Sequence, residues 1–138
     1  MKKPCLWPVA AMLAATTAMA AEDYDGSKAM TCPAIEGHDC LPNQAACKPL
    51  KPEAGKALEL KIDVANKVVQ TPFRTDKLPI ASVGKNAKSL ILQGTSLEMV
   101  WAATVHRTTG RLTLTIADRE GAYVIFGQCK LADAKPAQ

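Results

Sequence analysis

"RLTLTIADREGAYVIFGQC", residues 111–129, alternates apolar and polar side chains before a short turn and then continues as a second apolar segment. Leu112, Leu114 and Ile116 fall on one face of the first segment, and the threonines between them fall on the other. A period of two is typical of a strand with one buried face. A turn as short as "DREG" joins neighbouring antiparallel strands. The stretch therefore predicts a β-hairpin that ends at Cys129.

Two more strand patterns precede this hairpin. They are "KSLILQG", residues 88–94, and "LEMVWAATVHR", residues 97–107. The second pattern predicts one face made of Leu97, Met99, Trp101, Ala103 and Val105. We expect Gly110, after "TT", and Gly121, after "DRE", to supply the positive φ of tight turns.

The alternative for residues 97–106 is a helix capped by Ser96. The segment is short for a helix, alternates with a period of two and contains Val100, Trp101 and Val105. These features favour a strand. We therefore expect a core in which Trp101 is buried beside Leu114 and Phe126.

The chain before residue 88 gives weaker strand patterns. "KALELKIDV", residues 56–64, alternates with a period of two, and "KVVQ", residues 67–70, follows a short turn as a returning strand. "TPFRTDKLPIASVGKN", residues 71–86, predicts a loop with one edge strand. The predicted fold class is all-β, an antiparallel meander over residues 56–130 curled into a small barrel or half-sandwich.

Residues 21–55 differ in composition from the predicted sheet. They are rich in proline and cysteine, and prolines interrupt helices and central strands alike. We expect an irregular segment that disulfides hold in place. Residues 131–138, at the other end, are expected to be a flexible tail.

The first twenty residues have the pattern of a signal peptide. A basic start, "MKK", precedes an apolar run that ends in "AMA", which predicts cleavage between Ala20 and Ala21. Cys5 lies before the apolar run, so it is not placed for lipid modification. No other apolar run is long enough to predict a transmembrane segment. The expected location is the periplasm of a Gram-negative cell or the exterior.

The charge balance argues against nucleic acid as a partner. The 17 basic side chains include Lys2 and Lys3, so 15 remain after cleavage against 13 acidic ones. They are spread along the chain, and aromatic residues are only 4% of the sequence. Strong binding to nucleic acid or to an anionic membrane needs a concentrated basic surface.

The four remaining cysteines favour disulfides. They are Cys32, Cys40, Cys47 and Cys129, an even number in an oxidising compartment. The close pairs of a zinc site and the C-x-x-C of a thioredoxin-like site are absent from the sequence. Three pairings are possible, and we favour Cys32–Cys40 with Cys47–Cys129, because the second would tie the N-terminal segment to the last strand.

A metal site is a weaker hypothesis. His38, with Asp39 or Cys40, could ligate copper or zinc, and Met30 and His106 are further weak candidates. Oxidised cysteines no longer supply thiolate ligands, so the sequence predicts neither a metal nor another cofactor.

Catalytic motifs are equally absent from the sequence. His106, Arg107, Asp118, Arg119 and Glu120 are the polar residues near hairpin ends. His106 and Asp118 lie at opposite ends of their hairpin, roughly 23 Å apart at the rise of a strand. We therefore interpret this set as solvated turn charges and expect a protein that is not an enzyme.

The order of these pieces resembles a pattern in small exported bacterial proteins of unknown function. The matching pieces are "IDVANKVV", "MVWAATVHRTTGRL" and "FGQC", within residues 62–129. The resemblance implies an exported β domain with an R-x-T-G-x-L hairpin, in which Arg107, Thr109 and Gly110 serve the turn. It implies no active site.

The expected function is therefore non-enzymatic binding of a protein or cell-envelope component. A periplasmic metal-binding or small-ligand-binding protein is the first alternative. The second is an inhibitor similar to the periplasmic lysozyme inhibitors, which are small β-barrels with disulfides, although their serine- and glycine-rich inhibitory loop is not recognisable in this sequence.

Overall fold

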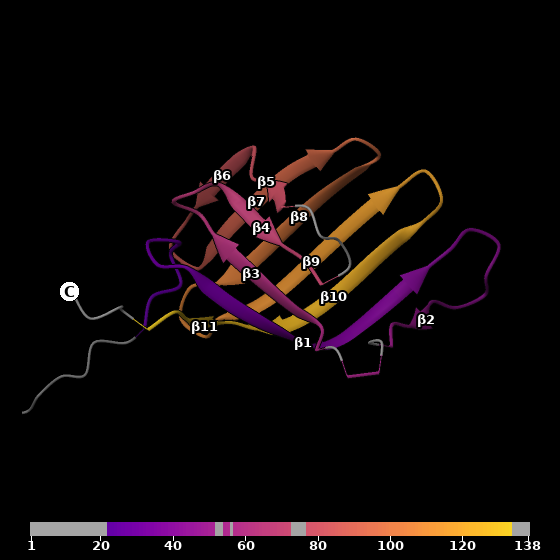
Figure 1. The fold of residues 1–138 in the computed structure, drawn as a ribbon, viewed down its shortest axis with the longest axis horizontal. Helices are drawn as coiled ribbons and strands as arrows, with labels where there is room; N and C mark the ends of the chain where they lie inside the picture. Colours follow the sequence, from indigo (N-terminus) through magenta and orange to yellow (C-terminus); the bar gives the residue numbers. More distant parts are fainter. Residues whose placement is uncertain (1–21, 52–53, 56, 73–76, 134–138) are drawn as a thin grey trace, which may run out of the picture.

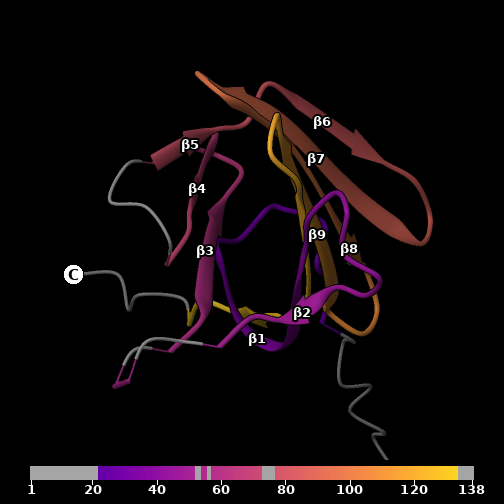
Figure 2. The ribbon, with the colours of Figure 1, turned by 90° about the vertical axis from the view of Figure 1, so that its right-hand side faces the viewer.

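A computed structural model describes residues 22–51, 54–55, 57–72 and 77–133. These residues form one antiparallel sheet that curls into a half-barrel (Figures 1 and 2). The predicted all-β class is confirmed. The described residues contain no helix, and so none that could cross a membrane. The predicted signal peptide, residues 1–20, lies outside the described residues.

The sheet has eleven strands, several of them short. Their bounds are β1 Met30–Cys40, β2 Lys48–Pro49, β3 Glu59–Asp63, β4 Val68–Gln70, β5 Lys77–Pro79, β6 Ser82–Lys85, β7 Ser89–Ser96, β8 Met99–His106, β9 Arg111–Asp118, β10 Ala122–Gln128 and β11 Lys130–Leu131.

The strand order is β5-β4-β3-β1-β10-β9-β8-β7-β6, with β2 and β11 paired to β1. Strands β6 to β10 pair each with the next, as the predicted meander requires. Strand β1 lies between this group and the smaller group β3 to β5. The first strand of the chain therefore joins two separate meanders.

The prediction that residues 21–55 are irregular is wrong for β1. This strand has 11 residues and lies in the middle of the sheet, despite Pro33. The register with β10 shifts between Ala34 and Glu36, and Ile35 is exposed. Pro33 pairs with Glu59 of β3, but the pairing of β1 with β10 begins only at Ala34, next to this bulge, so the missing N–H of Pro33 interrupts no pair with β10.

The segment 71–86 contains two edge strands, β5 and β6, where one was predicted. They are linked by Ile80 and Ala81. The Ile80 N–H donates to the Lys67 carbonyl at 2.9 Å, on one side of the half-barrel, and the Ala81 N–H donates to the Gln93 carbonyl at 2.8 Å, on the other. This link brings the two edges of the sheet together and gives the sheet its curl (Figure 2).

The concave face of the sheet holds the core. Trp101 and Leu114 are buried there as predicted, on neighbouring strands. The predictions for Phe126 and Leu97 are wrong, since both are exposed. In β10 the buried residue is Ile125, so alternation turns Phe126 outward, and Leu97 lies in the tight turn after β7.

The turn glycines differ from the prediction in one case. Gly110 has φ of +71°, as predicted, whereas Gly121 is not among the described residues with positive φ. A glycine is required at position 121 because the backbone of Cys40 approaches it closely. A Cβ there would lie 2.6 Å from the Cys40 carbonyl oxygen, so a larger residue would push β1 away from the β9–β10 turn.

The disulfides join Cys32 to Cys129 and Cys40 to Cys47, so the favoured pairing is wrong. Cys129 is joined to the N-terminal segment, as expected, but through Cys32. The reason is β1 itself, because an extended strand carries Cys32 and Cys40 far apart. Cys32 meets the end of β10, and Cys40 meets the returning chain before β2.

The predicted flexible tail also begins too early. Leu131 belongs to β11 and pairs with Met30, and the Ala132 N–H donates to the Ala29 carbonyl at 2.8 Å. Residues 134–138 lie outside the described residues.

Candidate ligand-binding cavity

The two ends of the half-barrel differ. At one end, residues 22–26 fold across the β8–β9 hairpin, and Tyr24 is 6% exposed there. The Tyr24 N–H donates to the Arg107 carbonyl at 2.9 Å. The Tyr24 ring lies against Gly110, where a Cβ would come within 2.7 Å of it. Tyr24 therefore closes this end.

A charged contact holds the closing segment. The Arg107 guanidinium donates from Nε to Asp23 Oδ1 at 2.9 Å and from Nη1 to the Asn86 carbonyl at 2.9 Å. The hydrogen bond to Asp23 raises the pKa of Arg107. Arg107 is therefore a turn charge that is partly exposed and also paired with Asp23. It tethers residues 84 positions away in the sequence, a contact that no local pattern could reveal.

The opposite end, which faces the viewer in Figure 2, contains a cavity of about 440 Å³. Five strands, the segment after β2 and the residue after β4 supply its described lining. The apolar lining consists of Leu50, Leu78, Met99, Ile116 and the ring of Tyr123, and the polar lining consists of Asp39, Lys51, Thr71 and Asp118.

Strand register places the two carboxylates in this cavity. Asp39 pairs with Tyr123 across β1 and β10, and Asp118 pairs with Met99 across β9 and β8. Asp39 Oδ1 is buried and has no hydrogen-bond partner. Asp118 Oδ1 accepts hydrogen bonds from the N–H groups of Glu120, at 2.7 Å, and Gly121, at 2.9 Å. Asp118 thus caps its turn with one oxygen and lines the cavity.

Tyr123 reports the electrostatics of this end. Burial raises the pKa of its phenol, and the negative charges of Asp39, Asp118 and Glu120 raise it further. The phenol therefore stays protonated and neutral at physiological pH. The carboxylates of Asp39, Asp118 and Glu120 therefore create a negative electrostatic potential around Tyr123.

The rim of the cavity is built by the chain after β1. The Cys40–Cys47 disulfide closes the turn that returns toward β1, and the Leu50 N–H then donates to the Gly37 carbonyl at 2.8 Å. The side chain of Leu50 packs against Gly37. These contacts hold Leu50 and the neighbouring Lys51 at the opening.

The predicted metal candidates are not brought together. His38 Nε2 lies 2.7 Å from Glu36 Oε1 on the convex face. His106, at the closed end, accepts hydrogen bonds on Nδ1 from the N–H groups of Thr108 and Thr109, each at 3.3 Å. Met30 is in the core. Within the described ranges, no three His, Cys, Asp or Glu side chains are grouped as metal ligands.

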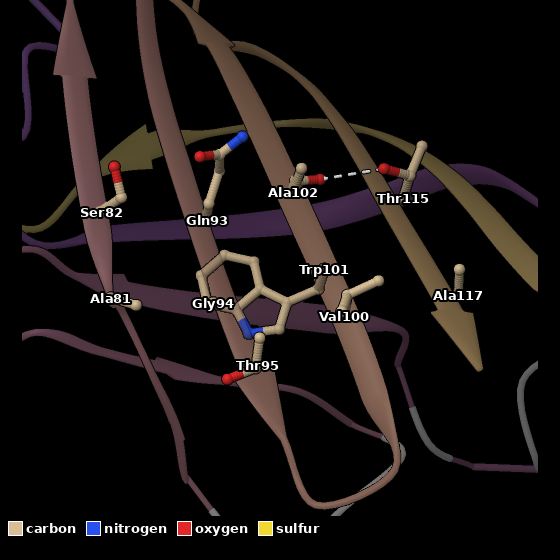
Figure 3. A pocket seen from close by; sticks show the side chains of 10 residues that line it. All are labelled: Ala81, Ser82, Gln93, Gly94, Thr95, Val100, Trp101, Ala102, Thr115 and Ala117. Carbon is tan, nitrogen blue, oxygen red and sulfur yellow. Dashed lines mark hydrogen bonds between the residues drawn. The ribbon is translucent and has the colours of Figure 1, made fainter.

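A second, shallower hollow lies on the convex face, lined by Ala81 and by residues of β6, β7, β8 and β9. Figure 3 shows Ser82, Gln93, Ala102 and Thr115 around it, with a hydrogen bond of 3.4 Å from the Thr115 hydroxyl to the Ala102 carbonyl. Its side chains are small, and the Trp101 ring lies against Gly94 on the core side. This hollow offers few groups that could hold a ligand.

Two large apolar side chains exposed on the convex face, Phe126 and Val100, have small or polar cross-strand partners. Phe126 pairs with Thr113, and Val100 pairs with Ala117. Scattered apolar side chains are ordinary on soluble proteins, whereas a contiguous patch marks a partner surface. The open-end cavity is therefore the stronger candidate site.

The lining of the cavity suits binding by apolar contact with a few polar anchors. Neither histidine nor serine nor cysteine is among its lining residues. Comparison of the chain with protein-family models, with curated proteins and with solved structures finds no match.

Proposed function

We propose that this protein is an exported, non-enzymatic binding protein that takes a small ligand with an apolar body into the open end of its half-barrel. The observation that carries the proposal is the cavity itself. Its apolar walls come from several strands, and a few polar groups converge on it, which is the usual composition of a small-molecule site. The volume lies in the range of such sites, roughly 300–1,000 Å³.

Binding is favoured over catalysis by the groups available. Asp118 is the only member of the polar hairpin set that lines the cavity, and one of its oxygens is occupied by its own turn. Tyr123 is held neutral by its surroundings. The lining lacks a histidine base beside a nucleophile, the arrangement that activates a hydroxyl or thiol.

A small ligand is favoured over the protein partner expected from the sequence. The cavity is lined by several elements, while Phe126 and Val100 on the convex face lie opposite Thr113 and Ala117, which are polar or small. A soluble cell-envelope molecule of small size would fit the same site. An inhibitor function has no specific observation in its favour.

The site can be tested with the neutral apolar fluorophore N-phenyl-1-naphthylamine. Wild-type protein should bind it with a rise in fluorescence. Met99→Gln should weaken the binding by about tenfold, because it replaces an apolar contact of the lining by a polar one of similar size. The dissociation constant is measured by fluorescence titration.

Val100→Gln is the matched control. Val100 is the next residue on β8, points to the convex face and is 55% exposed, so this variant should bind the fluorophore like the wild type. Equal losses in the two variants, or no binding by the wild type, would contradict the cavity as the site.

Export has its own test. We expect protein purified from the periplasm to begin at Ala21, because "AMA" precedes it in the pattern that signal peptidase cleaves. Intact mass spectrometry gives the answer directly. A mass that retains residues 1–20, or that includes acyl chains, would contradict the predicted signal peptide.

A further inference from the structure

We propose that the ligand of the open-end cavity is an organic ammonium ion with an apolar body. This inference rests on the proposed function and adds the chemical class of the ligand. The apolar walls would contact the body, and the carboxylates of Asp39 and Asp118 would interact with the charged nitrogen.

Asp39 provides the main argument. It lines the cavity from β1, a central strand, and its Oδ1 is shielded from solvent without a hydrogen-bond donor. A shielded carboxylate oxygen without a donor is costly, since that oxygen has lost its contact with water and gained no hydrogen bond. A cation bound in the cavity beside this carboxylate would compensate the charge.

The neighbouring carboxylates point the same way, and Lys48, a described residue that lies opposite Asp39 across β1 and β2, is exposed and forms no ion pair with it. Asp118 adds a second carboxylate to the lining, and Glu120 acts on Tyr123 from the adjacent turn. Charge complementarity therefore favours a positive ligand and disfavours an anionic one.

Among the described residues of the lining, Lys51 is the one cationic side chain. Lys51 is exposed at the rim. It forms no ion pair with Asp39 or Asp118, all three of which are described residues. Its charge is therefore placed in solvent, where water and salt screen it, while the oxygen of Asp39 is shielded. Removing Lys51 should strengthen the binding of a cation.

Three ligands with the same apolar chain but different charges separate the effect of charge on affinity from the effect of apolar contact. They are hexyltrimethylammonium, hexyl sulfate and 1-hexanol, each measured by displacement of N-phenyl-1-naphthylamine. The cation should bind about tenfold more tightly than the alcohol, and the sulfate more weakly than the alcohol. The advantage of the cation should shrink as NaCl is raised, because salt screens the attraction.

Asp39→Asn should abolish the advantage of the cation over the alcohol, and Asp118→Asn, which can still cap its turn, should reduce that advantage. Glu98→Gln is the matched control, because it removes a carboxylate near this end that does not line the cavity. Retention of the fluorophore by each variant shows that its cavity is intact.

The outcomes are distinct. Equal affinity for the cation and the sulfate, or an advantage that survives in Asp39→Asn, would overturn the ammonium inference while leaving the cavity as a neutral apolar site. Failure of the wild type to bind the fluorophore or any of the hexyl ligands would overturn the proposed function together with the inference.

Discussion

Replacing Cys32 and Cys129 together by alanine should lower the free energy of unfolding by about 4–5 kcal/mol. The disulfide closes a loop with a sequence separation of 97, and a cross-link over so long a loop removes much of the unfolded chain's entropy. Both cysteines are fully buried in the core, so the loss of their sulfur atoms adds a packing defect. Urea denaturation of the double variant and the wild type measures the difference.

The Cys40–Cys47 bond is the control for this prediction. Its sequence separation is only 7, and the same loop-entropy model gives about 2.5 kcal/mol for its removal. The Cys40→Ala/Cys47→Ala variant should also lose affinity for the fluorophore, since this bond supports the rim that holds Leu50. Equal destabilisation by the two double variants would contradict the assignment of Cys32–Cys129 as the main covalent support.

Trp101→Ala should cost roughly 3–5 kcal/mol of stability, as large aromatic-to-alanine changes in cores do. Trp101 is 3% exposed, and its ring fills the space over Gly94, where a Cβ would lie 2.6 Å from the ring. The indole of Trp101 thus occupies the space that a side chain at Gly94 would need. The surrounding strands cannot collapse into the space that alanine leaves.

The Trp101→Phe variant separates the contribution of ring packing to stability from the contribution of the polar indole N–H. The indole Nε1 is buried without a hydrogen-bond partner, so its loss removes no bond, and this variant should cost less than half as much as Trp101→Ala. Val100→Ala, at the exposed neighbouring position, should change stability by less than about 0.5 kcal/mol. A Trp101→Ala variant that melts at the wild-type temperature would show that Trp101 does not support the core.

The strong alternation in the second half of the chain was sufficient to predict its strands, though not the exposure of every residue in them. In β9 the burial of Leu112, Leu114 and Ile116 follows from a period of two, which is a local property of the backbone. The short turns around Gly110 and Gly121 then require antiparallel neighbours. Neither inference depends on contacts with distant parts of the chain.

The failures of prediction lie where local and distant requirements differ. Pro33 argues against a central strand locally, but it lies just beyond the part of β1 that pairs with β10, where its missing N–H interrupts no pair with that strand. Phe126 has a large apolar side chain, yet the register of β10 assigns the interior position to Ile125. The prediction of the disulfide pairing was wrong for the same reason, because the actual pairs depend on the position of β1 in the sheet.

The candidate site was the least predictable part. Asp39 was considered only as a companion of His38 in a metal site, whereas β1 directs it to the concave face opposite Tyr123. The inward orientation of Asp39 can be inferred only once β1 is known to be a strand and its register with β10 is known.

The sequence by itself determined the all-β class, the hairpins of the second half and an even set of cysteines suited to disulfides, because alternation, turn chemistry and cysteine count are local or compositional properties. The tertiary structure alone decided that β1 enters the middle of the sheet, which cysteines meet, and that Tyr24 closes one end while Asp39 and Asp118 line the other. Those features depend on pairings between segments far apart in the chain, such as the 84 positions between Asp23 and Arg107. No period or motif within either segment encodes them.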